Sequence, residues 1–278
     1  MRAKKHWGQH FLVDRSVGYR MVRTVGLSAD DVVLEIGPGR GALTGVLLEH
    51  ARRVIALEID GHLVDELTHR FPTDSLTLIN GDILTTDIGE LLDRQGVTER
   101  VRVFGNLPYN IATAVIQHLL RFRARIRDAT VMLQREVADR ILSPPGSKEY
   151  GYLSLVVQYF CEATKLFTVA PGVFRPVPKV HSTVVHLKMR DVPAVTVEDE
   201  EYFFEVISAC FSERRKTILN NLKRAASRLR LGPEVEAALA TAGIESGRRA
   251  ETLSLEEFAR LAQALAASRP AGDPSAHR

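Results

Sequence analysis

The residues best suited to chemistry begin at Asn106-Leu107-Pro108-Tyr109. The apolar run 101–104 before them predicts a buried strand, and Gly105 favours a turn directly after it. An asparagine amide, backbone carbonyls and a tyrosine ring are thereby presented at the carboxyl end of a strand, where open α/β sheets bind ligands. These groups could hold the amino group of an adenine while it is methylated. For the four residues alone, an Asn-x-Pro turn before the next helix is the better explanation, so the surrounding sequence has to decide.

A glycine-rich turn is the second candidate. Gly37-Pro38-Gly39-Arg40-Gly41 connects the predicted strand 32–36 to a helix that begins at Ala42. Such a turn lets the backbone approach a ligand and directs helix N–H groups toward it. Its spacing differs from the dinucleotide fingerprint, which has two residues between its last glycines. Glu35, directly before the turn, would repel a phosphate but suits an ammonium group. The glycines alone are also explained by a tight structural turn.

Acidic residues end the next two predicted strands. Glu58 follows strand 54–57, at about the separation where an acidic residue accepts hydrogen bonds from ribose hydroxyls. Asp82 follows strand 76–79 and could accept a hydrogen bond from an adenine amino group. Taken singly, each carboxylate is more often a solvated loop residue. Because both strand ends are expected at the edge that carries the glycine turn, a nucleoside cofactor is the better interpretation.

These residues must be positioned by strands that alternate with helices, and this alternation argues for a parallel, doubly wound α/β sheet. Five strands are expected at 32–36, 54–57, 76–79, 101–104 and 129–133. A helix is then expected over 152–161, and two more β-rich runs occupy 166–169 and 182–189. The Pro-rich stretch 174–179 argues against regular structure. Beyond 199 the chain is expected to be helical.

Composition and charge indicate a globular protein. The chain has 278 residues, 45% of them hydrophobic, and a formal net charge of +3. Its two cysteines, Cys161 and Cys210, lie far apart, which argues against a disulfide framework or a zinc site and favours a reducing compartment. Neither a signal peptide nor a membrane span is evident. We therefore expect a cytoplasmic monomer without a bound metal.

A domain boundary is expected near 190–199, where Pro193 and alternating valines and threonines give way to an acidic cluster. The predicted domains are residues 1–190, which include a basic N-terminal arm, and a helical domain over 198–267. The small, polar tail 268–278 is expected to be disordered.

Several of these motifs carry a family resemblance. Glu35-Ile36-Gly37-Pro38-Gly39-Arg40-Gly41 resembles the first motif of class I S-adenosylmethionine-dependent methyltransferases. Together with Asn106-Leu107-Pro108-Tyr109, it is similar to the rRNA adenine N6-dimethyltransferases. Further matches are Gly8-Gln9-His10-Phe11-Leu12, Met132-Leu133-Gln134-Arg135-Glu136-Val137-Ala138, Phe174-x-Pro176-x-Pro178-Lys179-Val180-x-Ser182 and Phe211-x-x-Arg214-Arg215-Lys216-Thr217-x-x-Asn220-Asn221-Leu222. The resemblance extends from about Gly8 to Phe258.

The resemblance implies a fold, a cofactor and a set of site residues. The fold is a Rossmann-like class I methyltransferase domain, with a mostly parallel seven-stranded sheet, followed by a smaller all-α domain. The cofactor is S-adenosyl-L-methionine, which leaves as S-adenosyl-L-homocysteine. The expected cofactor-binding residues are Gln9, His10, Leu12, Glu35, Gly37, Gly39, Glu58, Asp82, Ile83 and Asn106. The expected catalytic residues are Asn106, Leu107, Pro108, Tyr109 and Phe174.

A chemical hypothesis assigns roles to the catalytic residues. The Asn106 side-chain oxygen and the Leu107 or Pro108 carbonyl would accept the two N6 hydrogens, so that the nitrogen lone pair points at the sulfonium methyl. Tyr109 would stack on the base and Phe174 would cover its other face, as flipped bases are usually held. No strong base is required, because the methylated nitrogen loses its proton readily. Catalysis then rests on positioning and electrostatics.

Basic residues crowd the segment 213–230, in which Glu213 is the only acidic residue placed among them. A solvated helix face is the alternative, but the density favours contact with phosphates. A second basic run, 121–127, is explained equally well by a solvated loop. The expected RNA-binding residues are Lys179, Arg214, Arg215, Lys216, Lys223 and Arg224.

The substrate expected from the resemblance is the pair of adjacent adenosines in the 3′-terminal hairpin of 16S rRNA, within the 30S subunit. The nearest alternative is an Erm-type enzyme that acts on one adenosine of 23S rRNA and confers macrolide resistance. Leu107 and the pattern over 214–222 favour the small-subunit enzyme. A ribosome-assembly factor that acts mainly by binding is the alternative from another class.

Overall fold

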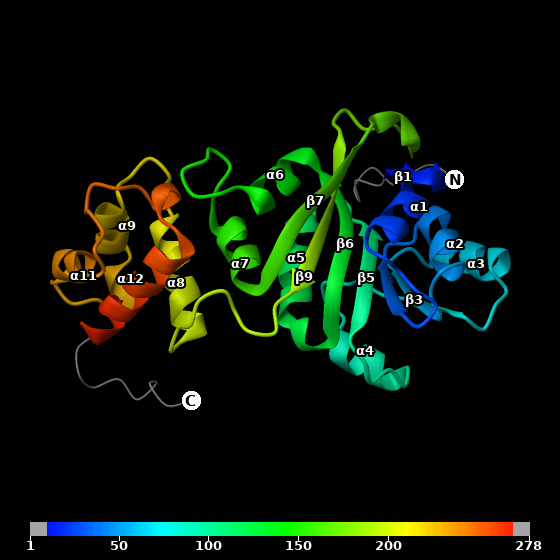
Figure 1. Ribbon diagram of the computed structural model, residues 1–278, viewed down its shortest axis with the longest axis horizontal. Helices are drawn as coiled ribbons and strands as arrows, with labels where there is room; N and C mark the ends of the chain where they lie inside the picture. The colour runs from blue at the N-terminus through cyan, green and yellow to red at the C-terminus, as the bar shows by residue number, and fades with distance from the viewer. Residues whose placement is uncertain (1–9, 269–278) are drawn as a thin grey trace. The chain divides into compact units, whose positions relative to one another are not determined.

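The computed structural model describes residues 10–268, so the predictions for Gln9, the basic N-terminal arm and the tail after Ser268 lie outside the described residues. The chain divides into two compact units. The first contains the described residues up to Leu142 together with Phe160–Asp191. The second contains Ser143–Tyr159 and the described residues from Val192 onward. Figure 1 shows the α/β character of the first unit and the helical character of the second.

The first unit is built on a seven-stranded sheet with the order β4-β3-β2-β5-β6-β9-β7. All neighbouring strands are parallel except β9, which runs antiparallel to both β6 and β7. The predicted Rossmann-like, mostly parallel sheet is therefore confirmed. The strands are β2 (Val32–Ile36), β3 (Arg53–Glu58), β4 (Leu76–Asn80), β5 (Val101–Asn106), β6 (Ile126–Gln134), β7 (Cys161–Val169) and β9 (Ser182–Met189).

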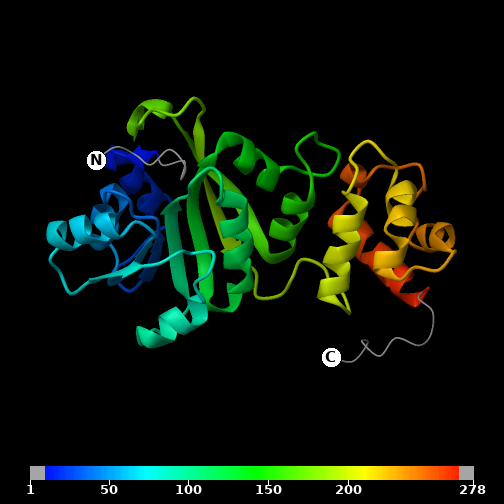
Figure 2. The same cartoon turned by 180° about the vertical axis from the view of Figure 1, so that it is seen from behind.

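Helices cover both faces of this sheet. The apolar stripes of α1 and α2 pack on one face, where Met21 and Val46 meet buried strand residues such as Phe104. Helix α5 lies on the opposite face, behind the strands in Figure 1 and in front of them in Figure 2. The helices of this unit are α1 (Arg15–Thr24), α2 (Ala42–Leu48), α3 (Gly61–Arg70), α4 (Ile88–Arg94), α5 (Ala112–Arg121) and α6 (Arg135–Leu142), with short 3-10 helices η2 (Arg123–Arg125) and η3 (Pro171–Val173).

A second, two-stranded sheet joins segments that are far apart in the sequence. Strand β1 (Phe11–Leu12) runs antiparallel to β8 (Phe174–Arg175), with Leu12 opposite Phe174. Both of these side chains are buried in the core cluster that also holds α1 and α2. The pairing therefore anchors the start of the described chain to the Pro-rich stretch, where the sequence predicts no regular structure.

The second unit is helical, and its core includes the buried side chains of Phe203, Leu222 and Phe258. Its last helix, α12, begins with a capping box between Ser254 and Glu257. The helices are α7 (Tyr152–Phe160), whose last residue belongs to the first unit, α8 (Glu200–Cys210), α9 (Ile218–Arg224), α10 (Ala226–Leu229), α11 (Val235–Thr241) and α12 (Leu255–Ala267), with the 3-10 helix η4 (Ala250–Thr252).

This division differs from the expected domains at the segment 143–159, which the sequence placed with the sheet. The segment belongs to the helical unit because the Tyr150 hydroxyl donates to the Leu253 carbonyl at 3.0 Å. The Gly146 N–H also donates to the Glu251 carbonyl at 2.7 Å. Between residues 10 and 268, none of the helices combines the length and the apolar character needed to cross a bilayer.

Candidate functional site

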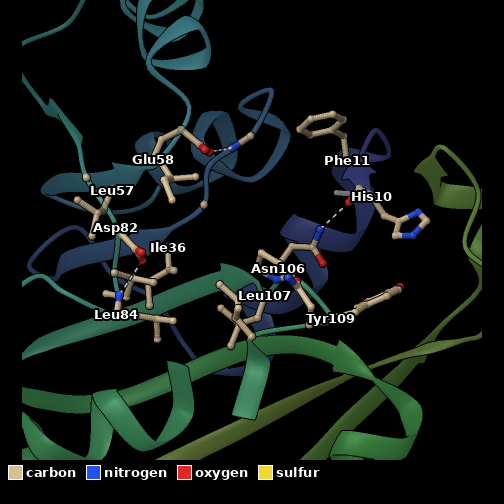
Figure 3. A pocket seen from close by; sticks show the side chains of 18 residues that line it. His10, Phe11, Ile36, Leu57, Glu58, Asp82, Leu84, Asn106, Leu107 and Tyr109 are labelled. Atoms are coloured by element: carbon tan, nitrogen blue, oxygen red, sulfur yellow. Dashed lines mark hydrogen bonds between the residues drawn. The ribbon is translucent and has the colours of Figure 1, made fainter. Parts of the chain in front are cut away.

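A cavity of about 300 Å³ opens at the carboxyl ends of the parallel strands. We call it the edge cavity. Figure 3 shows Leu57, Glu58 and Asp82 on one side of it and His10, Asn106 and Tyr109 on the other. The residues that line it are His10, Phe11, Ile36, Gly37, Gly39, Leu57, Glu58, Ile59, Gly81, Asp82, Ile83, Leu84, Asn106, Leu107, Pro108, Tyr109, Asn110 and Ile111. The lining combines apolar side chains with a few polar groups, which is typical of small-molecule sites.

Glu58, at the end of β3, is held by backbone donors. Its two carboxylate oxygens accept from the N–H groups of Gly39 and Asp60, each at 3.0 Å. The side chain is only 3% exposed. Burial raises the pKa of this carboxyl, although the backbone hydrogen bonds act in the opposite direction. Because each oxygen has a second lone pair, Glu58 can still accept from a ligand hydroxyl.

Asp82 follows β4 and lies beside Ile83 in the cavity lining. One of its oxygens, Oδ1, accepts from the Leu84 N–H at 2.9 Å. This local bond fixes the carboxylate, while the side chain remains partly exposed toward the cavity. A carboxylate that is only partly used by the protein can accept from an amino group of a ligand.

The glycine turn brings the backbone close to the cavity. Gly37 has a φ of +65° and Gly41 a φ of +76°, which are left-handed values that favour glycine. A Cβ at Gly37 would meet no atom within 4 Å, whereas one at Gly41 would come within 2.6 Å of the Phe71 ring. Gly37 therefore leaves space on the cavity side, and Gly41 allows α2 to pack against α3.

Asn106-Leu107-Pro108-Tyr109 forms the opposite wall. The Asn106 amide nitrogen, Nδ2, donates to the His10 main-chain carbonyl at 2.9 Å (Figure 3). Because a carbonyl can only accept, this bond fixes the orientation of the amide and turns Oδ1 away from His10. Among residues 10–268, Oδ1 has no hydrogen-bond partner. Leu107 is buried beneath the turn, and its N–H donates to the Met132 carbonyl at 3.1 Å.

Tyr109 is held at both ends. Its hydroxyl lies 3.2 Å from the Ser182 hydroxyl, and its ring centroid lies 5.1 Å from the ring centroid of His10. Burial raises the pKa of the phenol above its ordinary value of 10.0, so the hydroxyl stays protonated at neutral pH. A neutral, fixed ring at the cavity wall is suited to stacking on a base.

Eight of the lining residues were missed by sequence reasoning. They are Phe11, Ile36, Leu57, Ile59, Gly81, Leu84, Asn110 and Ile111. The Phe11 ring lies against the glycine turn, where a Cβ on Gly39 would come within 2.9 Å of the ring. Phe11 stands between two predicted cofactor residues in the sequence, and that adjacency is the signal that could have found it. All of the others except Ile111 are adjacent in the sequence to a predicted site residue.

Three predicted site residues lie away from the cavity lining in this structure. Leu12 and Phe174 face each other across the β1–β8 pairing and are buried in the core, with Phe174 0% exposed. Glu35 lies on the same face of β2 as Val33, which packs against α1 and α2, whereas Ile36 points the other way and lines the cavity. Strand alternation and apolar packing therefore place these side chains in the interior.

Glu35 stands out among these buried groups. Its side chain is 1% exposed, and no atom of the described chain bonds its Oε2. Burial raises its pKa from 4.5 to about 8, and the negative charge of Glu58 acts in the same direction. The carboxyl group of Glu35 therefore holds its proton at neutral pH.

The predicted RNA-binding residues of the second unit fall into two groups. Arg214 pairs with Glu251 at 2.8 Å and Lys223 with Glu236 at 2.7 Å, while Arg224 pairs with Glu213. Arg215 and Lys216 are exposed and have no ion-pair partner in the part of the chain that the structure describes. Lys179 is exposed on the loop of the first unit that follows β8. These three cations are the ones most available to phosphates.

Metal-binding and disulfide chemistry have no counterpart in the described residues. Across residues 10–268, histidine, cysteine and acidic side chains form no cluster that could hold an ion. Cys161 and Cys210 are both free and buried.

Comparison with known proteins agrees with this arrangement. The family model described as ribosomal RNA adenine dimethylase matches residues 1–267. The chain belongs to this family. The resemblance seen in the sequence motifs is thereby confirmed, as is the methyltransferase class.

Relatives in the ribosomal RNA adenine dimethylase family match nearly the whole chain. A ribosomal RNA small subunit methyltransferase A from Geobacter sulfurreducens is 46% identical over 96% of this chain and 97% of its own length. The corresponding protein from Geobacter metallireducens is 45% identical over 96% of this chain and 97% of its own length.

Solved structures resemble the chain in fold. The crystal structure of a dimethyladenosine transferase from Plasmodium falciparum has a TM-score of 0.74 at 26% identity, and covers 91% of this chain and 96% of its own. The structure of the 23S rRNA methyltransferase ErmE has a TM-score of 0.68 at 30% identity, and covers 92% of this chain and 99% of its own.

Proposed function

We propose that this protein transfers methyl groups from S-adenosyl-L-methionine to the N6 amino groups of two adjacent adenosines in the 3′-terminal hairpin of 16S rRNA, within the 30S subunit. One observation carries this proposal. The Asn106 amide is oriented by the His10 carbonyl, so that its oxygen is the available acceptor at the wall of the edge cavity. An amide oxygen fixed in this way suits an exocyclic amino group.

The edge cavity fits the proposed cofactor. Glu58 would accept from the ribose hydroxyls and Asp82 from the adenine amino group, with Ile83 against the base. Gly37 and Gly39 would allow the backbone to approach the ligand, and open space surrounds the position of a Cβ on Gly37. When bound, the cofactor supplies an electrophilic methyl group on a sulfonium. His10 would contribute through its main chain.

The target nitrogen needs two acceptors. Its lone pair is delocalised into the adenine ring, and hydrogen bonds from both N6 hydrogens favour a pyramidal nitrogen. Asn106 Oδ1 would accept one of them and the Leu107 or Pro108 carbonyl the other. Because the Nδ2–His10 bond already holds the amide, little reorganisation is needed at the moment of transfer. The proton on the methylated nitrogen is acidic enough to leave without a strong base.

Stacking on Tyr109 would hold the base. The ring is positioned by Ser182 at its hydroxyl and by the neighbouring ring of His10. Phe174 was predicted to cover the second face of the base, but its side chain is buried under β1. In this arrangement Phe174 would support the loop that follows β8, and a different group would cover the second face of the base.

The RNA would be held by exposed cations. Arg215, Lys216 and Lys179 are the predicted residues most available to phosphates, and such contacts provide affinity without reading sequence. We further propose that the protein acts as a monomer in the cytoplasm, where its two buried, free cysteines remain reduced. Relatives named small subunit methyltransferase A, at 45–46% identity, favour the 30S particle over the 23S rRNA that ErmE modifies at 30% identity.

Methyl incorporation from labelled cofactor tests this function. Unmethylated 30S particles and 50S particles would be offered in parallel. The expected result is incorporation into 30S particles alone. Incorporation into 50S particles would favour an Erm-type enzyme. Stable 30S binding and maturation without incorporation would favour an assembly factor that acts by binding.

A further inference from the structure

His10 makes three contacts with the parts of the site that receive the base. Its main-chain carbonyl accepts from Asn106 Nδ2 at 2.9 Å. Its ring nitrogen Nδ1 lies 2.7 Å from the Pro176 carbonyl oxygen, in the loop after β8. Its ring centroid lies 5.1 Å from that of Tyr109, with the two planes inclined by 31°. Figure 3 shows His10 beside both Asn106 and Tyr109 at the cavity.

The contact with Pro176 fixes the chemistry of the ring. A carbonyl oxygen can only accept a hydrogen bond, so Nδ1 must carry the proton and donate it. In a neutral imidazole, Nε2 is then unprotonated. The bond also sets the plane of the ring, which is inclined by 31° to the Tyr109 ring at a centroid distance of 5.1 Å, within the range of favourable aromatic pairs.

These contacts link three separate segments of the chain. The segment before β1 supplies His10, the end of β5 and the turn after it supply Asn106 and Tyr109, and the loop after β8 supplies Pro176. The loop that holds Pro176 directly follows β8, and β8 pairs with β1. Ser182 holds Tyr109 at its hydroxyl, and His10 contacts the ring itself.

We propose that the His10 side chain is a positioning residue for the target adenosine, an inference that rests on the proposed function. Its imidazole bridges Pro176 and Tyr109, and thereby fixes both the loop beside the base and the ring on which the base stacks. Because His10 packs against Tyr109, the adenine would stack on the part of the ring that His10 leaves open. This side-chain role is separate from the main-chain contact expected toward the cofactor.

Three substitutions separate the two ends of the bridge. H10A removes both the ring contact and the hydrogen bond. H10N retains a donor, because an asparagine Nδ2 can occupy the place of Nδ1, whereas H10F retains a ring without a donor. A matched control is H50A, because the His50 Nδ1 likewise lies 2.9 Å from a carbonyl, that of Val46, and its ring packs near Tyr19. His50 does not line the edge cavity.

The assay measures kcat and KM with 30S particles and, separately, the Kd for the cofactor. H10A is expected to lower kcat by roughly 10- to 100-fold, since misplacement of the reacting groups is costly. The cofactor Kd should change by less than about threefold, a difference well below 1.4 kcal/mol. H10N is expected to recover the part of the lost kcat that depends on the bond to Pro176, H10F the part that depends on the ring contact with Tyr109, and H50A should match the wild type.

A measurement on the wild-type protein complements the kinetics. Nitrogen-15 spectra of the histidine rings at pH 8.5 are expected to show His10 as the Nδ1–H tautomer, with the signal assigned by its loss in H10N. The other tautomer would overturn the proposal, because Nδ1 could then not donate to Pro176. An H10A kcat equal to or above that of the wild type would overturn it too. A wild-type protein that methylates no 30S particle would instead contradict the proposed function.

Discussion

The polar side chains of the edge cavity are held in place differently from the charged side chains of the basic segment of the second unit, residues 213–224. At the cavity, Glu58 and Asn106 are fixed by bonds to backbone groups and are at least half-buried. In the basic segment, the charged groups are exposed, and three of its five cations pair with neighbouring carboxylates. Exposed pairs contribute little to stability and are screened by salt.

This difference separates the expected effects of substitutions. A change at the cavity removes a group whose position is set in advance, so it should act on the methyl-transfer step or on cofactor affinity. A change in the basic segment removes an exposed charge, so it should act on RNA affinity and on its dependence on salt. Substitutions in the two regions test that separation, and the largest effect is expected at the cavity.

Asn106→Ala should give the largest loss. Removing the acceptor oxygen is expected to lower kcat by about 10²–10³-fold, the range found when one preorganised polar group is lost from an active site. N106D should also be impaired, because a carboxylate has no N–H to donate to the His10 carbonyl. Calorimetric titration should show that both variants still bind the cofactor. Full methyl transfer by N106A with normal cofactor binding would contradict the mechanism.

Neutralisation of Arg215 and Lys216 should weaken RNA binding by roughly tenfold at low salt. It should also reduce the salt slope by about one for each phosphate that the variant no longer neutralises. The matched double variant K223Q/R224Q changes the net charge equally, but its cations already face carboxylates, so its effect should be smaller. Filter binding at several salt concentrations measures both variants. Equal effects would mean that net charge, rather than local contact, governs RNA affinity.

Two glycine substitutions sharpen the comparison within the first unit. Both G37A and G41A place a side chain at positive φ, which costs roughly 1 kcal/mol. G41A should lose about 1–3 kcal/mol more, because its Cβ would come within 2.6 Å of Phe71 and 2.7 Å of Leu67. G37A should fold but bind the cofactor about tenfold more weakly, since its methyl group would enter the cavity. Denaturant unfolding and calorimetric titration distinguish the two outcomes.

Glu35→Gln should have the smallest effect on methyl transfer, because this side chain faces the core, and its effect on stability should depend on pH. The pKa of Glu35 is about 8 in the folded protein, above the ordinary 4.5, so the folded state keeps a proton that the unfolded state releases. Its contribution to stability is complete below pH 4.5 and is lost as pH rises through 8. Wild-type stability should therefore fall relative to E35Q between these limits.

Thermal unfolding without cofactor at several pH values measures this difference. E236Q is the control, because Glu236 is an exposed carboxylate paired with Lys223. It should shift the melting temperature little at any pH. A pH-independent difference between the wild type and E35Q would mean that Glu35 is ionised in the folded protein.

Much of the first unit could be predicted from local sequence patterns. The strand 32–36 has the predicted bounds, and the next helix begins at Ala42 as predicted, because an apolar run and turn residues mark them clearly. The late strands were less predictable. Strand β7 begins at Cys161, the predicted last residue of a helix, rather than at 166, because its pairing with β9 runs from Cys161 opposite Met189 to Val169. That pairing is non-local and leaves no periodic signal near Cys161.

The cavity was predictable at strand ends and less so in the interior. Glu58, Asp82 and Asn106 could be placed because parallel strands end at one edge of a sheet. Glu35 and Phe174 carry equally clear motifs, yet their side chains face the core. Side-chain direction at those positions depends on strand alternation and on the β1–β8 pairing. The same pairing brings His10 to Pro176, a contact between residues 166 positions apart.

Product mapping on 30S particles is the most direct test of the central claim. Particles with unmethylated 16S rRNA would be incubated with cofactor and either the wild type or N106A, and the 3′-terminal fragment would be analysed by mass. The wild type should convert two adjacent adenosines to N6-dimethyladenosine, and N106A should leave them largely unmodified. Products at another position, a single methyl group as the end point, or full dimethylation by N106A would contradict the account.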